Sequence, residues 1–480
     1  MAASRSNHFI PVILPVGLLM SGCVVTTNER QPDLAITTMW HETLPHGGQS
    51  ANMLSWWQSF GDSSLLQLIA LAQTENPDLA SAAADIEKAR ATLASSRAAL
   101  LPTLDGSGAA EGAGTEGERA NRVEEATTTS GALDASWEID LFGKNRLTRD
   151  AARERLGKQL ANWHDARVSL TAEVADDYVQ YRACRQLETI YQQELVSQRE
   201  TITATQKAVG SGFSSSSDLA LAKASAASSA STLTEQKAEC RILVKTLAQL
   251  TGGDETRVSS LLGKGRTTIP LAGKFNVNRV PAEAIRQRPD IQTLEREVAA
   301  SIAELGAAKA DLYPSLSLGG TITISSSTMS GQSAPWSFGP ALSLPLFDGG
   351  TRRAAVKSAL ADYHAAVAEY KSGVLGAVQE VEAALVHVNS TRLRMGDAKN
   401  AAENYRSYFD AIDINWKAGN ASLLDREEAR RSALSAEVTL IEIRRDATRY
   451  WIELYKALGG GWQAASDIPR PATHNGTDQK

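Results

Sequence analysis

Hydrophobic and polar positions follow two different periods along this chain of 480 residues. In two long stretches apolar residues recur at every third or fourth position, which is the period of an amphipathic helix. In shorter stretches apolar and polar residues alternate, which is the period of a strand with one apolar and one polar face. The pattern therefore predicts a chain that combines very long helices with a small number of strands.

The alternation is clearest from Leu133 to Leu141, where apolar residues take the odd positions and polar residues the even ones. The predicted strands are about 102–112, 131–142, 314–325 and 336–347. Each is close to the roughly 9 to 11 residues of a tilted membrane-spanning strand, and aromatic residues lie near the strand ends. A soluble sandwich with one buried face would alternate in the same way. The glycine-rich polar segments 111–130 and 325–335 are predicted to be exposed hairpin loops.

The helical stretches predict two long hairpins. In the second, apolar residues keep a spacing of three or four from Val356 to Val388, and no proline occurs from 348 to 463. A helix over 351–417 would be about 100 Å long at 1.5 Å per residue, which is unusual in a compact enzyme. Turns are predicted near Gly212 and Gly419, where glycine interrupts the helical pattern.

The sequence contains an internal repeat. Eight positions from Pro77 to Leu104 recur without a gap 212 residues later, from Pro289 to Leu316. Gly212, Ser215 and Asp218 correspond to Gly419, Ser422 and Asp425 at an offset of 207. So long a period indicates a duplicated supersecondary unit. The predicted organisation is a first repeat over 62–261, a linker over 262–280, a second repeat over 281–463 and a polar tail over 464–480.

The N-terminus carries a targeting signal. Arg5 precedes an apolar stretch, 9–20, that is too short to span a bilayer as a helix and fits a secretory signal peptide over 1–22. The segment Leu19-Met20-Ser21-Gly22-Cys23 resembles a bacterial lipobox, which implies lipid attachment at Cys23 and a lipidated arm over 23–61. The alternative is a thiol in a signal peptide that is simply discarded.

Composition and motifs argue against several other functions. A net charge of −6 without a cluster of basic residues gives no footprint for nucleic acid. The seven histidines are scattered, and no HExxH or GxSxG motif occurs, so we expect neither an enzyme nor a metal site. The GxGxxG pattern at 112–117 lies between loop-like flanks and contains Glu116, which would repel phosphate. No cofactor is therefore expected.

Several short segments are distinctive, and they occur in this order along nearly all of the mature chain: NPDL at 76–79, WEIDLFGK at 137–144, QRPDI at 287–291, LYPSLSL at 312–318, LPLFDGG at 344–350 and YKALGGGW at 455–462. They resemble signature stretches of the outer-membrane efflux protein (TolC-like) family, most closely its NodT-type lipoprotein branch.

The resemblance implies an α+β membrane protein that works as a homotrimer. Each chain would contribute four transmembrane strands to a 12-stranded barrel and long helices to a periplasmic α-helical barrel. The implied function is the outer-membrane exit duct of a tripartite efflux system. Its partners would be a periplasmic adaptor (membrane fusion) protein, an inner-membrane transporter of the RND type and outer-membrane lipid. Alternatives are the outlet of a type I protein secretion system and a lipid-anchored periplasmic coiled-coil scaffold.

The resemblance also points to functional positions. Acidic residues just after the tip of the last hairpin line the periplasmic constriction in the family, which gives Asp425 and Glu428 as a candidate gate. The alternative is that these acids only complement the positive end of the helix dipole. Gly212, Asp218 and Gly419 are the candidate adaptor contacts at the two hairpin tips.

The two remaining cysteines lie symmetrically about the first tip. Cys184 precedes Gly212 by 28 residues and Cys240 follows it by 28, so an antiparallel hairpin brings them to the same level. In an oxidising periplasm a disulfide is one outcome, provided both side chains face the contact between the helices. Two buried free thiols are the other.

Overall fold

The computed structural model describes residues 29–30, 32, 40–41, 53–116, 123–273 and 281–460. The predicted signal peptide, Cys23 and the tail over 464–480 lie outside the described residues. The chain divides into two compact units, each built from three segments. The first comprises Met1–Pro32, Ala89–Leu156 and Glu297–Val367, and the second comprises Asp33–Lys88, Gly157–Arg296 and Ala368–Lys480.

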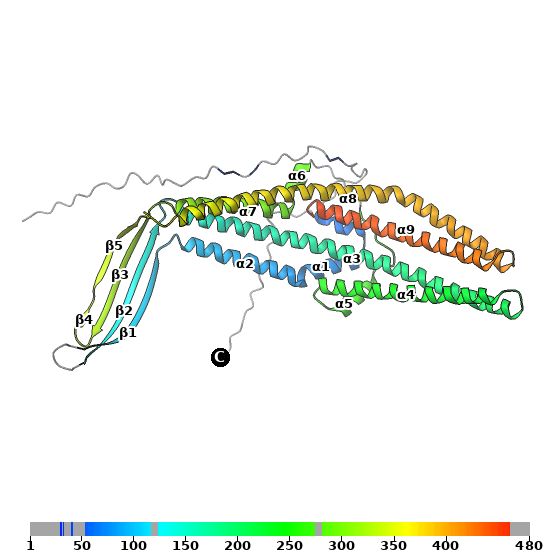
Figure 1. Cartoon of the computed structure of the whole chain (residues 1–480), viewed down its shortest axis with the longest axis horizontal. Helices are drawn as coiled ribbons and strands as arrows, with labels where there is room; N and C mark the ends of the chain where they lie inside the picture. Colours follow the sequence, from blue (N-terminus) through cyan, green and yellow to red (C-terminus); the bar gives the residue numbers. More distant parts are fainter. Residues whose placement is uncertain are drawn as a thin grey trace, which may run out of the picture. The chain divides into compact units, whose positions relative to one another are not determined.

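The first unit contains an antiparallel sheet (Figure 1). Its strands are β1 (Thr103–Glu116), β2 (Val123–Ile139), β3 (Ser315–Ser327), β4 (Gly331–Ser333) and β5 (Trp336–Ser343). The strand β1 pairs with β2, β2 pairs with β3, and β3 pairs with both β4 and β5. Large apolar side chains such as Leu133, Ile324 and Phe338 are exposed on this sheet. An apolar surface of this kind marks contact with a membrane or with another chain.

The strands β1 and β2 are longer than the sequence predicted, and β5 is shorter. The prediction of a loop over 111–130 was wrong at both ends, because β1 continues to Glu116 and β2 already begins at Val123. The predicted loop over 325–335 likewise contains the end of β3 and all of β4. The fourth predicted strand ends early, at Ser343 in β5. Pro345 follows closely and has no backbone N–H to donate to a sheet.

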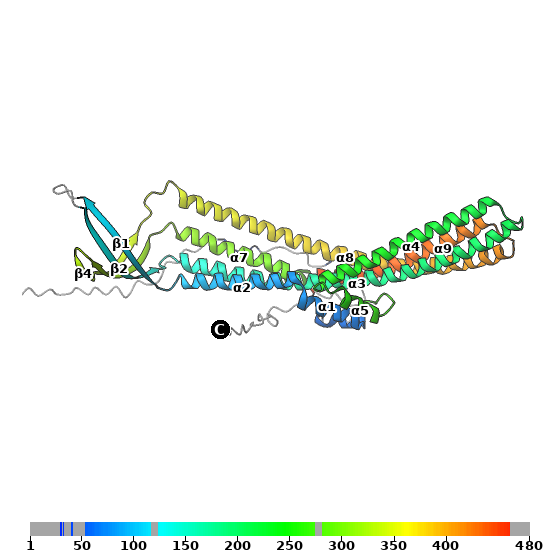
Figure 2. The same cartoon turned by 90° about the horizontal axis from the view of Figure 1, so that it is seen from below.

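Four long helices form two hairpins, and the parts that approach the tips belong to the second unit (Figures 1 and 2). The first hairpin is α3 (Lys144–Gly210) with α4 (Ser216–Leu250), and the second is α8 (Thr351–Lys417) with α9 (Leu423–Ala457). The helix α8 has the predicted bounds. The shorter helices are η2 (Met53–Phe60), α1 (Ser63–Glu75), α2 (Pro77–Ala98), α5 (Glu255–Lys264), α6 (Pro281–Arg286) and α7 (Pro289–Ala310).

Aromatic packing joins η2 to the end of α9. Trp56, in η2, stacks on Tyr455 with ring centroids 4.7 Å apart, and its indole Nε1 donates a hydrogen bond of 2.7 Å to the carbonyl of Gly273. Trp57 and Phe60 complete the cluster, and all three η2 aromatic residues are buried. Residues 53–60 of the predicted arm over 23–61 therefore form a 3₁₀ helix. Among the described residues, no helix is both long enough and apolar enough to span a membrane.

Candidate functional site

The two hairpin tips close in the same way. Gly212 has a φ of +78° and Gly419 a φ of +80°, values in the left-handed region that favours glycine. Just after each glycine a backbone N–H donates to a carbonyl five residues earlier, from Phe213 to Ala208 at 2.9 Å and from Asn420 to Asn415 at 2.8 Å. These bonds satisfy carbonyl groups that a helix end leaves unpaired, so each glycine allows the chain to reverse.

Each return helix then starts with a capping box. In α9 the backbone N–H of Asp425 donates to Ser422 Oγ at 3.1 Å, and the backbone N–H of Ser422 donates to Asp425 Oδ2 at 3.0 Å. Ser215 and Asp218 make the same pair of bonds in α4, at 3.1 and 3.0 Å. Both carboxylates therefore satisfy backbone donors at a helix N-terminus. This local role agrees with the helix-end alternative considered for Asp425.

The cap also fixes the charge of the two carboxylates. The hydroxyl and backbone hydrogen bonds from Ser422 lower the pKa of Asp425 below its usual value. A backbone hydrogen bond from Ser215, with hydroxyl bonds from Ser214 and Ser215, lowers the pKa of Asp218. Asp425 is exposed and Asp218 is half-buried, and with their lowered pKa values both remain ionised at neutral pH. If several copies meet at the tips, Asp425 supplies a permanent negative charge from each.

Glu428 lies one helical turn beyond Asp425 and is also exposed. At 100° per residue, these two acids share one side of α9, and Arg426 and Arg430 take the opposite side. The opposite side is buried. The predicted gate residues therefore project from the free face of the second hairpin, and the face behind them packs against the rest of the unit.

That buried face contains an ion network that the sequence did not reveal. The side chain of Arg426 is 4% exposed; its Nε lies 2.5 Å from Asp413 Oδ1 of α8, and its Nη1 donates to Thr201 Oγ1 of α3 at 2.6 Å. Its guanidinium also lies 4.4 Å from the centroid of the Trp416 ring, a cation–π contact. Arg426 thus links three helices from both hairpins.

Arg430 extends the network by one turn. Its side chain is 3% exposed, with Nη1 lying 3.1 Å from Glu427 Oε1 and Nη2 donating to Thr201 Oγ1 at 3.1 Å. The Nε2 of Gln198 donates to both Glu194 and Glu427, at 2.8 Å each, and so bridges α3 to α9. Burial raises the pKa of Glu194 and lowers that of Arg430. We call Glu194, Gln198, Thr201, Asp413, Arg426, Glu427 and Arg430 the arginine clamp.

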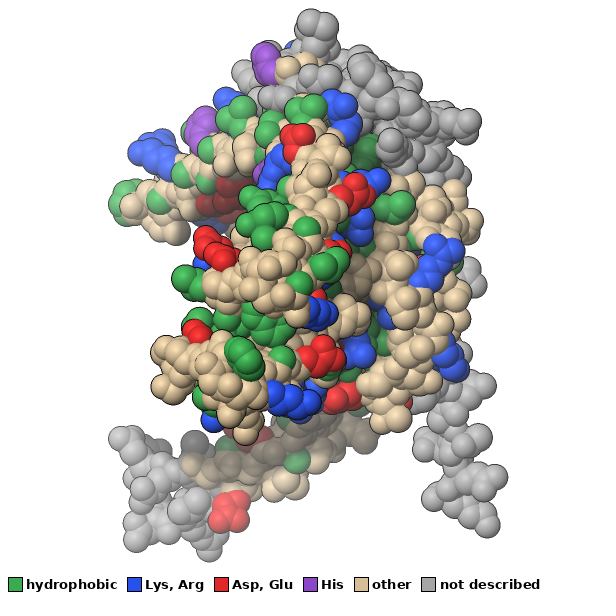
Figure 3. Space-filling model, turned by 90° about the vertical axis from the view of Figure 1, so that its right-hand side faces the viewer, with side chains coloured by type: hydrophobic (Ala, Val, Ile, Leu, Met, Phe, Trp, Pro, Cys, Tyr) green, Lys and Arg blue, Asp and Glu red, His purple; other side chains and the backbone are tan. Residues whose placement is uncertain are grey.

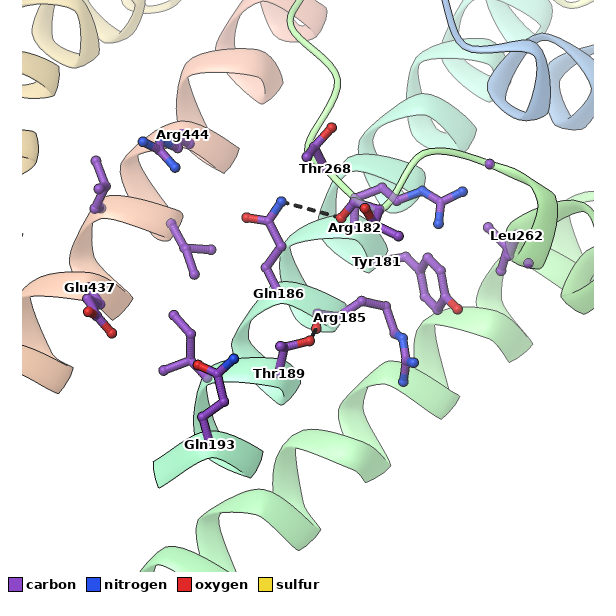
Figure 4. Close-up of a pocket in the computed structure, with 16 residues that line it drawn as sticks. Tyr181, Arg182, Arg185, Gln186, Thr189, Gln193, Leu262, Thr268, Glu437 and Arg444 are labelled. Atoms are coloured by element: carbon purple, nitrogen blue, oxygen red, sulfur yellow. Dashed lines mark hydrogen bonds between the residues drawn. The ribbon is translucent and has the colours of Figure 1, made fainter. Parts of the chain in front are cut away.

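Farther from the tips, α3 and α9 are separated by an open groove of about 650 Å³ (Figure 4). Residues within 181–193 of α3 and 437–444 of α9 line it, together with the end of α5 and the segment that follows. Gln186 reaches across and donates to the carbonyl of Thr267 at 3.4 Å. The hairpins are thus not packed uniformly, and the arginine clamp holds them together on the tip side of the groove.

Cys184 and Cys240 are joined in a disulfide, with Cα atoms 5.6 Å apart. Both residues are buried, and the bond links α3 to α4 within the first hairpin.

At the tip of the first hairpin Phe213 is 88% exposed. Viewed from the side of the hairpin tips, acidic, basic and apolar side chains are interspersed (Figure 3). Within the described ranges, no three His, Cys, Asp or Glu residues are grouped to hold a metal ion.

Comparison with known proteins identifies the family. The model of the "Outer membrane efflux protein" family matches residues 68–253 and 280–460. Nodulation protein T of Rhizobium leguminosarum bv. trifolii is 30% identical over 449 residues, which cover 93% of this chain and 96% of that protein. The solvent efflux pump outer membrane protein SrpC of Pseudomonas putida is 27% identical over 479 residues, covering 94% and 98%.

Solved structures agree with the sequence matches. The outer-membrane channel OprN superposes with a TM-score of 0.81 at 28% identity, covering 92% of this chain and all of that one. The family and this structural relative are channel proteins and not enzymes. The matches span both repeats and the sheet, so they concern the whole architecture. The chain therefore belongs to the outer membrane efflux protein family.

Proposed function

We infer that this protein is the outer-membrane exit duct of a tripartite efflux system. The observation that carries this inference is the match of the full architecture, sheet and both hairpins, to an outer-membrane channel. The exposed apolar side chains of the sheet support it, because they suit a lipid-facing wall and would be unfavourable in water. We place the sheet in the outer membrane and the helices in the periplasm, with Cys23 as the lipid attachment site.

We further propose that three copies assemble around one axis. The outer strands β1 and β5 leave open edges in the single chain, and neighbouring copies would pair with them. The partners would be a periplasmic adaptor at the hairpin tips and an inner-membrane transporter of the RND type. Gly212, Asp218 and Gly419 form the proposed adaptor contact, and the exposed ring of Phe213 adds an apolar anchor beside the first glycine.

The gate is proposed at Asp425 and Glu428. Threefold symmetry would convert each into a ring of carboxylates, and the capping hydrogen bonds that lower the pKa of Asp425 in the single chain favour its charged form. Such rings bind cations at the narrowest point of a channel and disfavour anions. A divalent cation such as Mg²⁺ should therefore block conduction from the side of the hairpin tips.

The test separates the charge of Asp425 from its capping role. Asp425→Asn keeps a side-chain oxygen that can accept from Ser422, but it removes the charge. In planar bilayers we expect this variant to need at least tenfold more Mg²⁺ for half-block than the unaltered protein. Asp218→Asn is the matched control, because the same cap in the first hairpin loses the same charge.

Equal weakening of Mg²⁺ block by Asp425→Asn and Asp218→Asn would reject the gate assignment. Absence of any single-channel conductance from the purified unaltered protein would reject the duct itself. It would favour the lipid-anchored scaffold, which would need long helices but no pore.

A further inference from the structure

We propose that the groove between α3 and α9 binds the carboxylate-bearing peptides of peptidoglycan, the glycan polymer of the bacterial periplasm. The inference rests on the proposed function only because that function places the helices in the periplasm. It gives the protein a second role, attachment of its helical part to the cell wall, which conduction through a duct does not require.

The groove has the size of a small-molecule site. Its volume of about 650 Å³ lies within the range of roughly 300–1,000 Å³ that is typical of ligand pockets. One face of α3 forms the floor, α9 forms a wall, and residues within 262–268 complete the lining (Figure 4). All three segments belong to the second compact unit. The groove is therefore built within one part of the chain.

Cationic side chains outnumber acidic ones among the described residues that line the groove. Arg182, Arg185 and Arg444 carry positive charge, and Glu437 carries negative charge. Glu437 is already held by Arg406, whose Nε donates to its Oε1 at 2.7 Å. The exposed Arg444 has no ion-pair partner in the described part of the chain. A guanidinium group binds a carboxylate through two parallel hydrogen bonds, so the groove favours an anionic ligand.

Arg182 supplies a fixed positive charge in the floor. It is buried, and its Nη2 donates to the Tyr178 hydroxyl at 2.9 Å. Asp62 reaches it only through that hydroxyl, which donates to Asp62 Oδ2 at 2.5 Å. The backbone of Gly265 passes so close that a Cβ there would overlap the Arg182 guanidinium. The charge is therefore held in one place, without the entropy cost of ordering a free side chain on binding.

The neutral part of the lining suits a polar ligand better than a protein helix. A helix that docks in a groove lays an apolar face into a hydrophobic surface. Here most of the lining is polar, and its amide and hydroxyl side chains both donate and accept hydrogen bonds; they are Gln186, Thr189, Gln193, Thr267 and Thr268. Peptidoglycan offers hydroxyl, amide and carboxylate groups, so its chemistry complements both the neutral and the cationic side chains.

The experiment sediments the purified full chain, in detergent, with isolated peptidoglycan that has been treated with protease. We expect the protein to sediment, and N-acetylmuramyl-L-alanyl-D-isoglutamine to release it. In the double variant Arg185→Gln with Arg444→Gln, half-sedimentation should need at least tenfold more peptidoglycan, because two charge-assisted hydrogen-bonding groups are lost. Arg431→Gln is the matched control, since Arg431 is an exposed arginine of α9 outside the lining.

Unchanged sedimentation of the double variant, or equal weakening by Arg431→Gln, would overturn the site. Equal release by the same muramyl peptide with its carboxylate converted to an amide would overturn the recognition of a carboxylate. Sedimentation only with peptidoglycan that still carries its attached proteins would assign the groove to a protein partner instead.

Conductance in planar bilayers separates this proposal from the duct. The double variant should conduct as the unaltered protein does, which also shows that it folds. Sedimentation of an unaltered protein that never conducts would reject the proposed duct and support the groove. Conduction without any sedimentation of the unaltered protein would reject the groove and leave the duct intact.

Discussion

Replacing Arg426 with methionine tests how strongly the clamp holds the second hairpin. Methionine keeps much of the apolar stem, so the change removes mainly the guanidinium group. That group makes an ion pair with Asp413, a hydrogen bond to Thr201 and a cation–π contact with Trp416. The expected effect is easier local unfolding of the first turns of α9 and of the end of α8 that faces them.

The size of the loss in free energy depends on which partners Asp413 keeps after the substitution. Removing one partner of a buried ion pair typically costs about 3–5 kcal/mol, because the other charge is left without compensation. Here Lys417 Nζ also lies 2.6 Å from Asp413, so that carboxylate keeps a cationic neighbour. Burial raises the pKa of Asp413, but the bonds from Lys417 and Arg426 lower it overall. We therefore expect a loss near the lower end, about 3 kcal/mol, which corresponds to roughly 100-fold.

Amide hydrogen exchange measures this quantity, because protection of a helix reports the free energy of its local opening. In Arg426→Met, peptides covering 411–433 should exchange roughly 100-fold faster, with α4 unchanged. Arg431→Met is the matched control, since Arg431 is the neighbouring exposed arginine of the same helix and its loss should matter little. Less than threefold acceleration in Arg426→Met, or equal acceleration in both variants, would refute the energetic argument.

Two further predictions concern the first hairpin. Thiol labelling of the denatured, unreduced protein should leave Cys184 and Cys240 unmodified, and reduction should expose both; labelling without reduction would exclude the disulfide. Burial, reinforced by the charges of Asp176 and Glu173, raises the pKa of Asp177 to about 6 from 3.8, and its Oδ2 has no hydrogen-bond partner. Because the folded state holds this proton more tightly than the unfolded state, stability should fall as pH rises from about 4 to 6. Asp177→Asn should therefore raise the thermal midpoint at pH 7.5 but not at pH 4, and an equal gain at both would contradict this cause.

The sequence predicted those elements whose signals are local. The bounds of α8 followed from an unbroken apolar spacing, the absence of proline and the glycine at 419. The extent of β1 and β2 did not, because 111–116 and 123–130 consist mainly of small or polar residues that also suit loops. Backbone pairing with a neighbouring strand, which no single segment encodes, decides their length.

The arginine clamp was missed for a similar reason. The run Asp425-Arg426-Glu427-Glu428 looks like a solvated helix surface, since charged residues are rarely buried. Arg426 can be buried because it contacts Trp416 and Asp413 on the preceding helix and Thr201, which lies 225 positions earlier in the sequence. A pattern read along one helix cannot report partners at such separation. Asp425 was found because the family resemblance points to acids just after the last hairpin tip, whereas nothing in the resemblance pointed to the buried groups behind it.

The duplicated tips show which part of the second hairpin is special. Asp218 and Asp425 make the same cap, so the cap alone cannot explain a gate in only one repeat. At the offset of 207, Arg426 and Arg430 correspond to Leu219 and Lys223, and Lys223 is exposed. Only the second repeat therefore has arginines at these positions.

Different substitutions should therefore alter the charge of Asp425 and the orientation of its side chain. Asp425→Asn should weaken Mg²⁺ block without faster exchange in α9, because the cap and the clamp both remain. Arg426→Met should weaken block and accelerate exchange together, because the carboxylate keeps its charge but loses its fixed direction. If Arg426→Met accelerated exchange and left block unchanged, the clamp would stabilise the hairpin without positioning the gate.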